Sequence, residues 1–249
     1  MAVVLKSASE IEKMRRAGHV VRETLDLMKT LVKPGVSTWD LDKAAEELIR
    51  SRGALPTFKG YHGYPATLCT SVNEEVVHGI PSKKRILHEG EIVSIDCGAT
   101  LEGFVGDSAI TLGVGQIDDT SAKLLKVTEA SLYAAIEVVK PGATLGDVGA
   151  AVQEVVEAAG FSVVRDFVGH GVGAKMHEDP QVPNFGHRGR GMKLKAGMVI
   201  AIEPMVNAGD WQVVVLKDGW TAVAADGSRS AHFEHTVAVT ATGSMILTE

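Results

Sequence analysis

The stretches Gly90-Glu91-Ile92-Val93-Ser94-Ile95-Asp96 and Gly197-Met198-Val199-Ile200-Ala201-Ile202-Glu203 decide the fold. Each is a short apolar run that starts at a glycine and ends in a carboxylate, and this pattern predicts a buried strand. The two stretches have the same spacing (140 − 33 = 107 residues) as the motifs Lys33-Pro34-Gly35 and Lys140-Pro141-Gly142. Agreement of turns and strands in the same order indicates two similar halves.

Helix signals flank both Lys-Pro-Gly motifs. Ser7-Ala8-Ser9-Glu10 is typical of a capping box, in which side chains satisfy the free backbone groups of a helix start. Apolar spacing predicts helices over about 7–33 and 37–53 in the first half, and over about 121–140 and 144–160 in the second. Proline ends the longer helix of each half because it cannot donate to the helical hydrogen-bond ladder.

A third correspondence needs a larger offset. Gly106-Asp107 matches Phe233-Glu234 at a spacing of 127 residues (234 − 107), so about twenty extra residues are expected near 211–226. We therefore predict an α/β (α+β) fold with two pseudo-symmetric helix-helix-strand-strand halves around a central antiparallel sheet. The halves would cover about 7–113 and about 118–249 within a single domain, 1–249.

Composition excludes several classes of protein. The 249 residues include 25 Lys and Arg against 31 Asp and Glu, so the formal charge of −6 argues against binding to a nucleic-acid backbone. No apolar run approaches the roughly 18 residues of a membrane span. The apolar run at the start is too short for a secretory signal, and only two cysteines occur. We expect a cytoplasmic protein without a disulfide framework.

Four carboxylates occupy equivalent places in the two halves: Asp96 and Asp107 in the first, Glu203 and Glu234 in the second. A single acid of this kind would be interpreted as a strand end near solvent. Four inward carboxylates would carry a charge of about −4, which is costly to bury and which two divalent cations would cancel. Oxygen-rich ligands favour ions such as Mn, Co, Fe or Zn.

Three histidines lie in glycine-rich or turn-like surroundings. His170 is flanked by Gly169 and Gly171, and His78 and His177 occur in Val-His-Gly and Met-His-Glu contexts. Each motif alone is equally typical of a turn with an exposed histidine. Several histidines beside four acids indicate metal-assisted hydrolysis.

Together the motifs resemble the type I methionine aminopeptidases of the bacterial kind, over nearly the whole chain. The matching segments are 61–65, 73–81, 94–96, 106–107, 169–173, 202–205 and 233–236. The resemblance implies the duplicated pita-bread fold and a cytosolic metallo-exopeptidase. This enzyme removes the initiator methionine from nascent proteins with a small second residue.

The resemblance also implies roles for individual residues. The implied metal ligands are Asp96, Asp107, His170, Glu203 and Glu234. A metal-bound hydroxide would attack the first carbonyl, Glu203 would shuttle the proton, His177 would stabilise the oxyanion, and His78 would bind the substrate at the scissile bond. The methionine side chain would lie against Tyr61, Tyr64, Cys69 and Trp220.

Five positions depart from the family pattern. Gly98 stands where some members have a Thr near the site of the substrate amine, and Val105 stands where many have a His before Gly106. Phe58 and Met176 stand where relatives often have Cys and Phe, and both would border the methionine pocket; His232 replaces a common Gln beside Glu234. Cys69 could also be interpreted as a nucleophile, but no local Cys–His signature supports that interpretation.

The expected partners are the N-termini of nascent polypeptides near the ribosome. We expect the protein to be a monomer that binds neither nucleic acid nor membranes. Two alternatives remain open. One is a proline-specific peptidase of the same fold, whose members usually carry a further N-terminal domain. The other is a metal-free protein-binding module, which would have lost metal ligands.

Overall fold

A nine-stranded antiparallel sheet forms the centre of the computed structural model, which describes residues 3–249. Its main path runs β1-β4-β5-β14-β9-β7-β8, with β2 beside β4 and β15 beside β14. The strands of this sheet are β1 (Leu55–Pro56), β2 (Leu68–Val72), β4 (Ile92–Leu101), β5 (Phe104–Gly113), β7 (Gly169–Gly171), β8 (Glu178–Val182), β9 (Val199–Ile202), β14 (Glu234–Val239) and β15 (Ser244–Ile246).

Four helices flank the sheet at the predicted places: α1 (Ala8–Leu31), α2 (Thr38–Ser51), α3 (Asp119–Val138) and α4 (Leu145–Ala158). Ser7, Ser37 and Thr144 each make a complete capping box, so the predicted starts of α1, α2 and α4 are confirmed. Helix α3 begins two residues before the predicted Ser121, because the Asp118 side chain caps it by accepting the Ser121 N–H.

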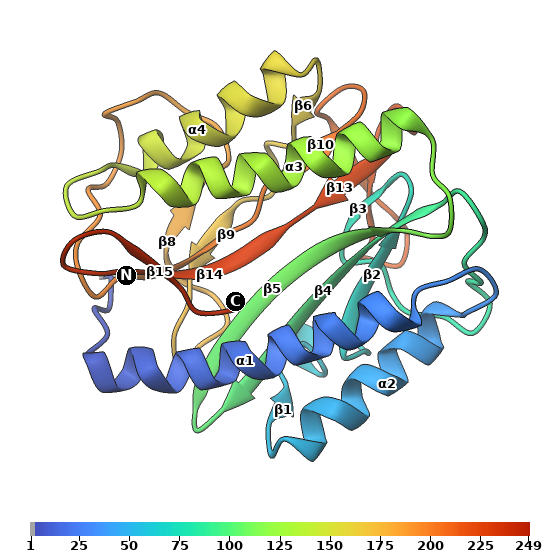
Figure 1. Cartoon of the computed structure of the whole chain (residues 1–249), viewed down its shortest axis with the longest axis horizontal. Coiled ribbons are helices and arrows are strands. Elements are labelled where there is room, and N and C mark those ends of the chain that lie inside the picture. The colour runs from blue at the N-terminus through green and yellow to red at the C-terminus, as the bar shows by residue number, and fades with distance from the viewer. Residues whose placement is uncertain (1–2) are drawn as a thin grey trace.

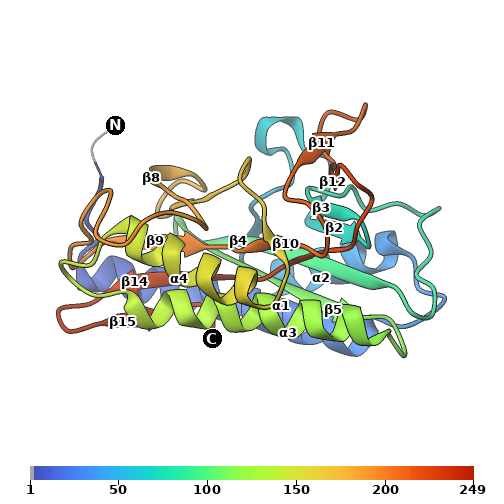
Figure 2. The ribbon, with the colours of Figure 1, turned by 90° about the horizontal axis from the view of Figure 1, so that it is seen from above.

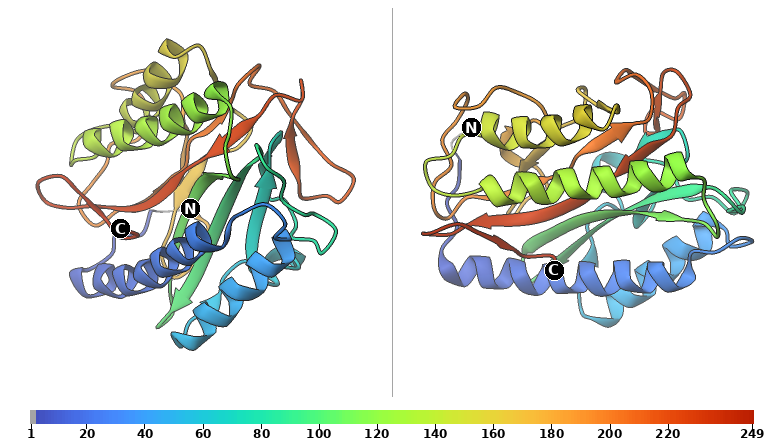
Figure 3. Two further views of the ribbon diagram at one scale, coloured as in Figure 1. Left: turned by 45° about the vertical axis from the view of Figure 1, so that its right-hand side comes forward. Right: turned by 45° about the horizontal axis from the view of Figure 1, so that its top comes forward.

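The two halves meet where β5 pairs with β14 (Figure 1). Helices α1 and α2 cover the strands of the first half, and α3 and α4 cover those of the second (Figure 3). Cys97 packs within the cluster under α1 and α2, on the strand face opposite Asp96. The antiparallel sheet with two helix-helix-strand-strand halves is therefore confirmed.

Two small sheets lie outside the main sheet; the first packs against α3, and the second lies on the side away from α1 and α3 (Figure 2). One consists of β13 (Ser230–His232), β10 (Met205–Asn207) and β6 (Ser162–Val163). The other consists of β11 (Val213–Val215), β12 (Ala222–Ala224) and β3 (Glu75–Val77), and a short 3₁₀ turn, η1, spans Tyr61–Gly63. The β11–β12 hairpin falls within the predicted insertion at 211–226. Within residues 3–249, none of the helices is long and apolar enough to cross a membrane.

Candidate metal centre and substrate pocket

Strand register brings the four carboxylates to one face of the sheet. On β5, Ala109 lies opposite Asp96 of β4 on one side and opposite Glu234 of β14 on the other. Asp107 is two residues before Ala109 and therefore points to the same face. On the next strand, Ile202 pairs with His235, so Glu203 follows β9 next to Glu234. A small residue at the centre of the row leaves room between the acids.

His170 on β7 completes the cluster. Its Nε2 lies 3.5 Å from Glu203 Oε1 and 3.7 Å from Asp107 Oδ2. Ligand atoms of Asp107, His170 and Glu234 all lie within 4.8 Å of one another, and all three residues are buried. The His170 Nδ1 is 3.0 Å from the Gly171 carbonyl, which leaves Nε2 directed toward the carboxylates.

Burial and mutual repulsion act on the same acids. Burial, followed by the neighbouring Asp107 charge, raises the pKa of Asp96 and of Glu203 well above their ordinary values. The pKa of Glu234 is raised for the same two reasons, and burial raises the pKa of Asp107 to about 7. Four ionised carboxylates are therefore unfavourable here without a compensating positive charge.

The donor set fits divalent metal ions. Asp96 Oδ1, Asp107 Oδ1 and Glu234 Oε1 are buried oxygens without a hydrogen-bond partner in the protein. Such atoms are costly to leave unsatisfied, and carboxylate oxygens with one imidazole nitrogen suit first-row divalent ions.

The two other predicted histidines lie beside this cluster. The rings of His177 and His170 are 4.2 Å apart, and the Tyr61 hydroxyl is 2.8 Å from His177 Nδ1. Burial lowers the pKa of His177 below its ordinary value, and it lowers the pKa of His78 to about 4. Both rings are therefore neutral near pH 7.

Backbone hydrogen bonds hold His78 in a left-handed conformation, with φ at 61°. The following Gly79 carbonyl accepts the Thr70 N–H and the Tyr64 hydroxyl, while its N–H donates to Ser71 Oγ. A non-glycine residue at positive φ persists only where its surroundings fix it. These contacts therefore orient the His78 ring.

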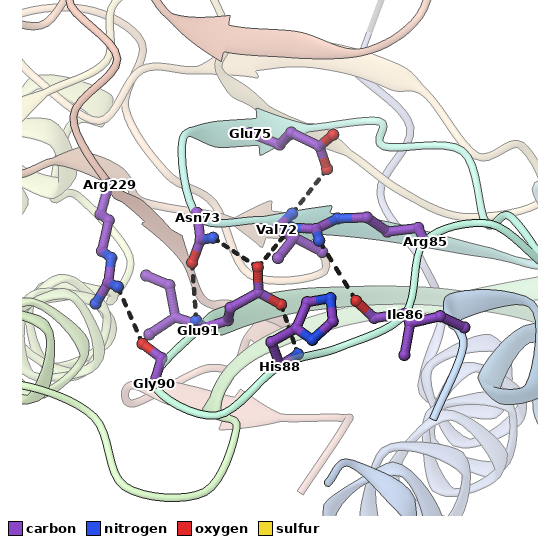
Figure 4. Close-up of polar contacts among 10 residues, drawn as sticks. Val72, Asn73, Glu75, Arg85, Ile86, His88, Gly90, Glu91 and Arg229 are labelled. Atoms are coloured by element: carbon purple, nitrogen blue, oxygen red, sulfur yellow. Dashed lines mark hydrogen bonds and ion pairs between the residues drawn. The ribbon is translucent and has the colours of Figure 1, made fainter. Parts of the chain in front are cut away.

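A second hydrogen-bond network fixes the two ends of the segment 72–91, which contains His78 (Figure 4). The half-buried Glu91 carboxylate accepts the Asn73 amide, the Arg85 guanidinium and the His88 N–H. The Glu75 carboxylate accepts the Val72 N–H at 2.7 Å. Residues 72–91 are thus fixed on both sides of His78.

A cavity of about 410 Å³ opens over the carboxylates. All residues predicted for the site line it: Asp96, Asp107, His170, Glu203 and Glu234 at the acidic end, His78 and His177 beside them, and Phe58, Tyr61, Tyr64, Cys69, Met176 and Trp220 along the wall. Of the wall residues, Phe58, Tyr64, Cys69 and Met176 are buried in one apolar cluster, with Tyr61 and Trp220 packed against it.

Two further residues shape this cavity, although the sequence assigned neither of them a role in it. His62 lines it, with φ at 47° and its ring edge-on to Tyr61. Gly98 admits the Phe58 ring, because a Cβ at Gly98 would lie 2.6 Å from Phe58 Cε1. The sequence contained both signals, a histidine in a Tyr-His-Gly-Tyr turn and a glycine two residues after Asp96.

Cys69 is buried, and burial beside Asp96 raises the pKa of its thiol well above the ordinary value. The thiol is therefore protonated near pH 7 and is a poor nucleophile. This supports the interpretation of Cys69 as part of the wall.

Known proteins are similar to this chain along nearly its entire length. Residues 12–241 match metallopeptidase family M24. The chain is 53% identical to a methionine aminopeptidase of Clostridium acetobutylicum over 246 residues, which cover 99% of this chain and 98% of that protein. It is 52% identical to methionine aminopeptidase 1 of Bacillus subtilis, with 99% of each chain covered.

The fold has a close counterpart among solved structures. The crystal structure of a methionine aminopeptidase from Thermotoga maritima superposes with a TM-score of 0.98 at 50% identity, and the match covers 100% of both chains. The curled antiparallel sheet is thus the pita-bread fold expected from the sequence. By profile, sequence and fold, the chain belongs to metallopeptidase family M24.

Proposed function

We propose that this chain is a methionine aminopeptidase, which hydrolyses the first peptide bond of proteins and releases their N-terminal methionine. One observation carries the proposal: a cluster of four acids and one histidine lies at the end of a cavity whose wall is apolar and aromatic. The close relatives named above have the same activity in their names.

The ligands that would hold metal are Asp96, Asp107, His170, Glu203 and Glu234. Membership of a metallopeptidase family implies divalent metal use. Four carboxylates suit a pair of ions, of which Co, Mn, Fe and Zn are the candidates. When bound, the ions would supply Lewis acidity toward the substrate carbonyl and make the attacking water more acidic.

The protein side chains perform the remaining steps. Glu203 accepts the proton of the attacking water and passes it to the leaving amine, a role that its place at the acidic end of the cavity supports. His177 donates a hydrogen bond to the oxygen that becomes negative, while Tyr61 holds its other ring nitrogen. His78 also lines the cavity beside the acids and binds the substrate at the scissile bond.

The apolar wall of the cavity selects the N-terminal residue of the substrate. An unbranched thioether fits a cavity bounded by aromatic rings and sulfur, with Tyr64 and Trp220 edge-to-face at 5.0 Å. Met176 and Cys69 contribute polarizable sulfur atoms to the same wall. Branched or charged first residues would leave their own groups poorly packed or unpaired there.

Several broader features belong to the same proposal. The chain would act in the cytoplasm as a monomer, on nascent N-termini near the ribosome. Residues 1–249 would form one catalytic domain whose halves, about 7–113 and about 118–249, arose by duplication. The pairing of β5 with β14 at the centre supports the duplication.

The test compares peptides after controlled metal loading. The purified chain is treated with a chelator, reloaded with Mn²⁺ or Co²⁺, and incubated with Met-Ala-Ser and with X-Pro peptides. Release of methionine from Met-Ala-Ser only after reloading supports the proposal. Cleavage confined to X-Pro peptides would identify a proline-specific enzyme, and binding of peptides without cleavage under all metals would indicate a binding module.

A further inference from the structure

His232 is a buried imidazole that the proposed mechanism does not use. It lies on β13 with 2% of its surface exposed, and its Nε2 has no hydrogen-bond partner in the protein. A buried donor or acceptor left alone costs about 1–3 kcal/mol. The position of such an atom beside a functional site therefore requires an explanation.

The backbone around His232 is fixed on two sides. Its N–H donates to Thr111 Oγ1 at 2.9 Å, and the Thr111 hydroxyl donates to the His232 carbonyl at 2.7 Å. On the other side, His232 pairs with Met205 of β10. The direction of the ring therefore follows from the sheet and not from a mobile loop.

The ring faces the back of Glu203. Its Nε2 lies 3.8 Å from Glu203 Oε2, while His170 lies 3.5 Å from the other oxygen, Oε1. His232 does not line the cavity, so it contacts the carboxylate from the side away from substrate. The separation exceeds a hydrogen bond by roughly 0.8 Å, a distance that a small rotation of the Glu203 side chain covers.

We propose that His232 is a positioning residue for Glu203, whose Oε2 accepts a hydrogen bond from His232 Nε2–H when the carboxylate binds a metal ion. The inference rests on the proposed function, because it takes Glu203 as a metal ligand. Ligating carboxylates need such an outer partner to fix their orientation, and loss of one weakens metal affinity by about 10–100-fold.

Three variants separate hydrogen bonding from packing. In His232→Gln the amide keeps an N–H donor, whereas His232→Leu has no donor and a similar bulk. Met205→Leu is the matched control, since Met205 is fully buried and pairs with His232 across the same two strands. The measurement is the Kd for Mn²⁺ of each chelator-treated protein by isothermal titration calorimetry, with thermal unfolding of the metal-free forms.

We expect wild type, Met205→Leu and His232→Gln to bind Mn²⁺ alike, and His232→Leu to bind about 10–100-fold more weakly without a matching loss of thermal stability. Equal affinity in wild type and His232→Leu would overturn the inference. An equal loss in His232→Gln and His232→Leu would overturn it as well, because that pattern would come from a nitrogen ligand or a packing role. Failure of wild type to bind any metal would instead reject the proposed function itself.

A measurement on the wild-type chain keeps the inference testable if His232→Leu does not fold. With ¹⁵N-labelled histidine and Zn²⁺, the nitrogen spectrum distinguishes the two ring tautomers and metal-bound nitrogen. We expect His232 to carry its hydrogen on Nε2 in the loaded protein. A hydrogen on Nδ1, or a metal-bound Nε2, would overturn the inference.

Discussion

Gly98→Ala tests how closely the pocket wall is packed. Gly98 lies on β4, two residues after Asp96 and on the same face, opposite Asp107. A Cβ there would lie 2.6, 3.1 and 3.2 Å from three carbons of the Phe58 ring. Ordinary carbon contacts begin near 3.5 Å, so the ring must move by roughly 0.9 Å.

The cost of that movement is the cost of overpacking a buried site. Phe58 is 7% exposed within the apolar cluster and cannot turn freely into solvent. Overpacking costs about 1–3 kcal/mol, which corresponds to a factor of roughly 5 to 150 in an equilibrium or rate constant. Phe58 lines the cavity, so a displaced ring would take up space meant for the substrate side chain, and we expect much of the cost to appear in substrate binding.

The assay is steady-state hydrolysis of Met-Ala-Ser by the metal-loaded chain, with thermal unfolding measured in parallel. We expect KM to rise more than kcat falls in Gly98→Ala. A second change, Phe58→Leu, should restore much of kcat/KM because it removes the contacted ring carbons. Unchanged kcat/KM in Gly98→Ala, or no rescue in the double variant, would refute the reasoning.

Four other predictions concern the acidic end of the cavity. Asp107→Asn should nearly abolish turnover, because it removes a buried charge from the acids that would hold the metal ions; normal turnover in a folded variant, checked by circular dichroism, would contradict the assignment. His177→Ala should lower kcat far more than metal content measured by atomic absorption; proportional losses would make His177 a ligand. Tyr61→Phe removes one hydrogen bond to His177, worth about 0.5–1.5 kcal/mol, so kcat should fall by up to roughly tenfold, and an unchanged kcat would exclude that role. After chelation, the raised pKa values of the four acids mean that the folded chain keeps protons there that the unfolded chain has lost. Below about pH 6.5 the buried histidines oppose this difference, because burial lowers their pKa values, so the window that isolates the acids runs from about pH 6.5 to at least pH 7. Calorimetric Tm should therefore fall as pH rises through that window, and metal should remove most of the fall; a Tm that rises instead would oppose the assigned burial.

Local sequence signals were sufficient to predict the helices and to predict that the four acids lie close together. Capping residues such as Ser7 and Thr144 act on their own helix, so their effect is visible without tertiary contacts. The apolar runs before Asp96 and Glu203 predicted buried strands, and the internal repeat then indicated that both would lie on one sheet.

Contacts between residues far apart in the sequence could not be predicted from these local signals. The contact between Phe58 and Gly98 depends on the pairing of β1 with β4, and neither residue signals the other in sequence. His232 was noted as a departure from the family pattern, but its 3.8 Å approach to Glu203 follows from the pairing of β13 with β10. Such distances depend on register in three dimensions, which motif spacing does not specify.

Metal titration of the chelator-treated chain tests the central claim most directly. Calorimetry would count Mn²⁺ ions bound per chain while the same samples are assayed for methionine release from Met-Ala-Ser. The convergence of Asp96, Asp107, Glu203 and Glu234 predicts two ions per chain and activity that returns only as they bind. Full activity in the chelated chain, or no Mn²⁺ binding at all, would contradict it.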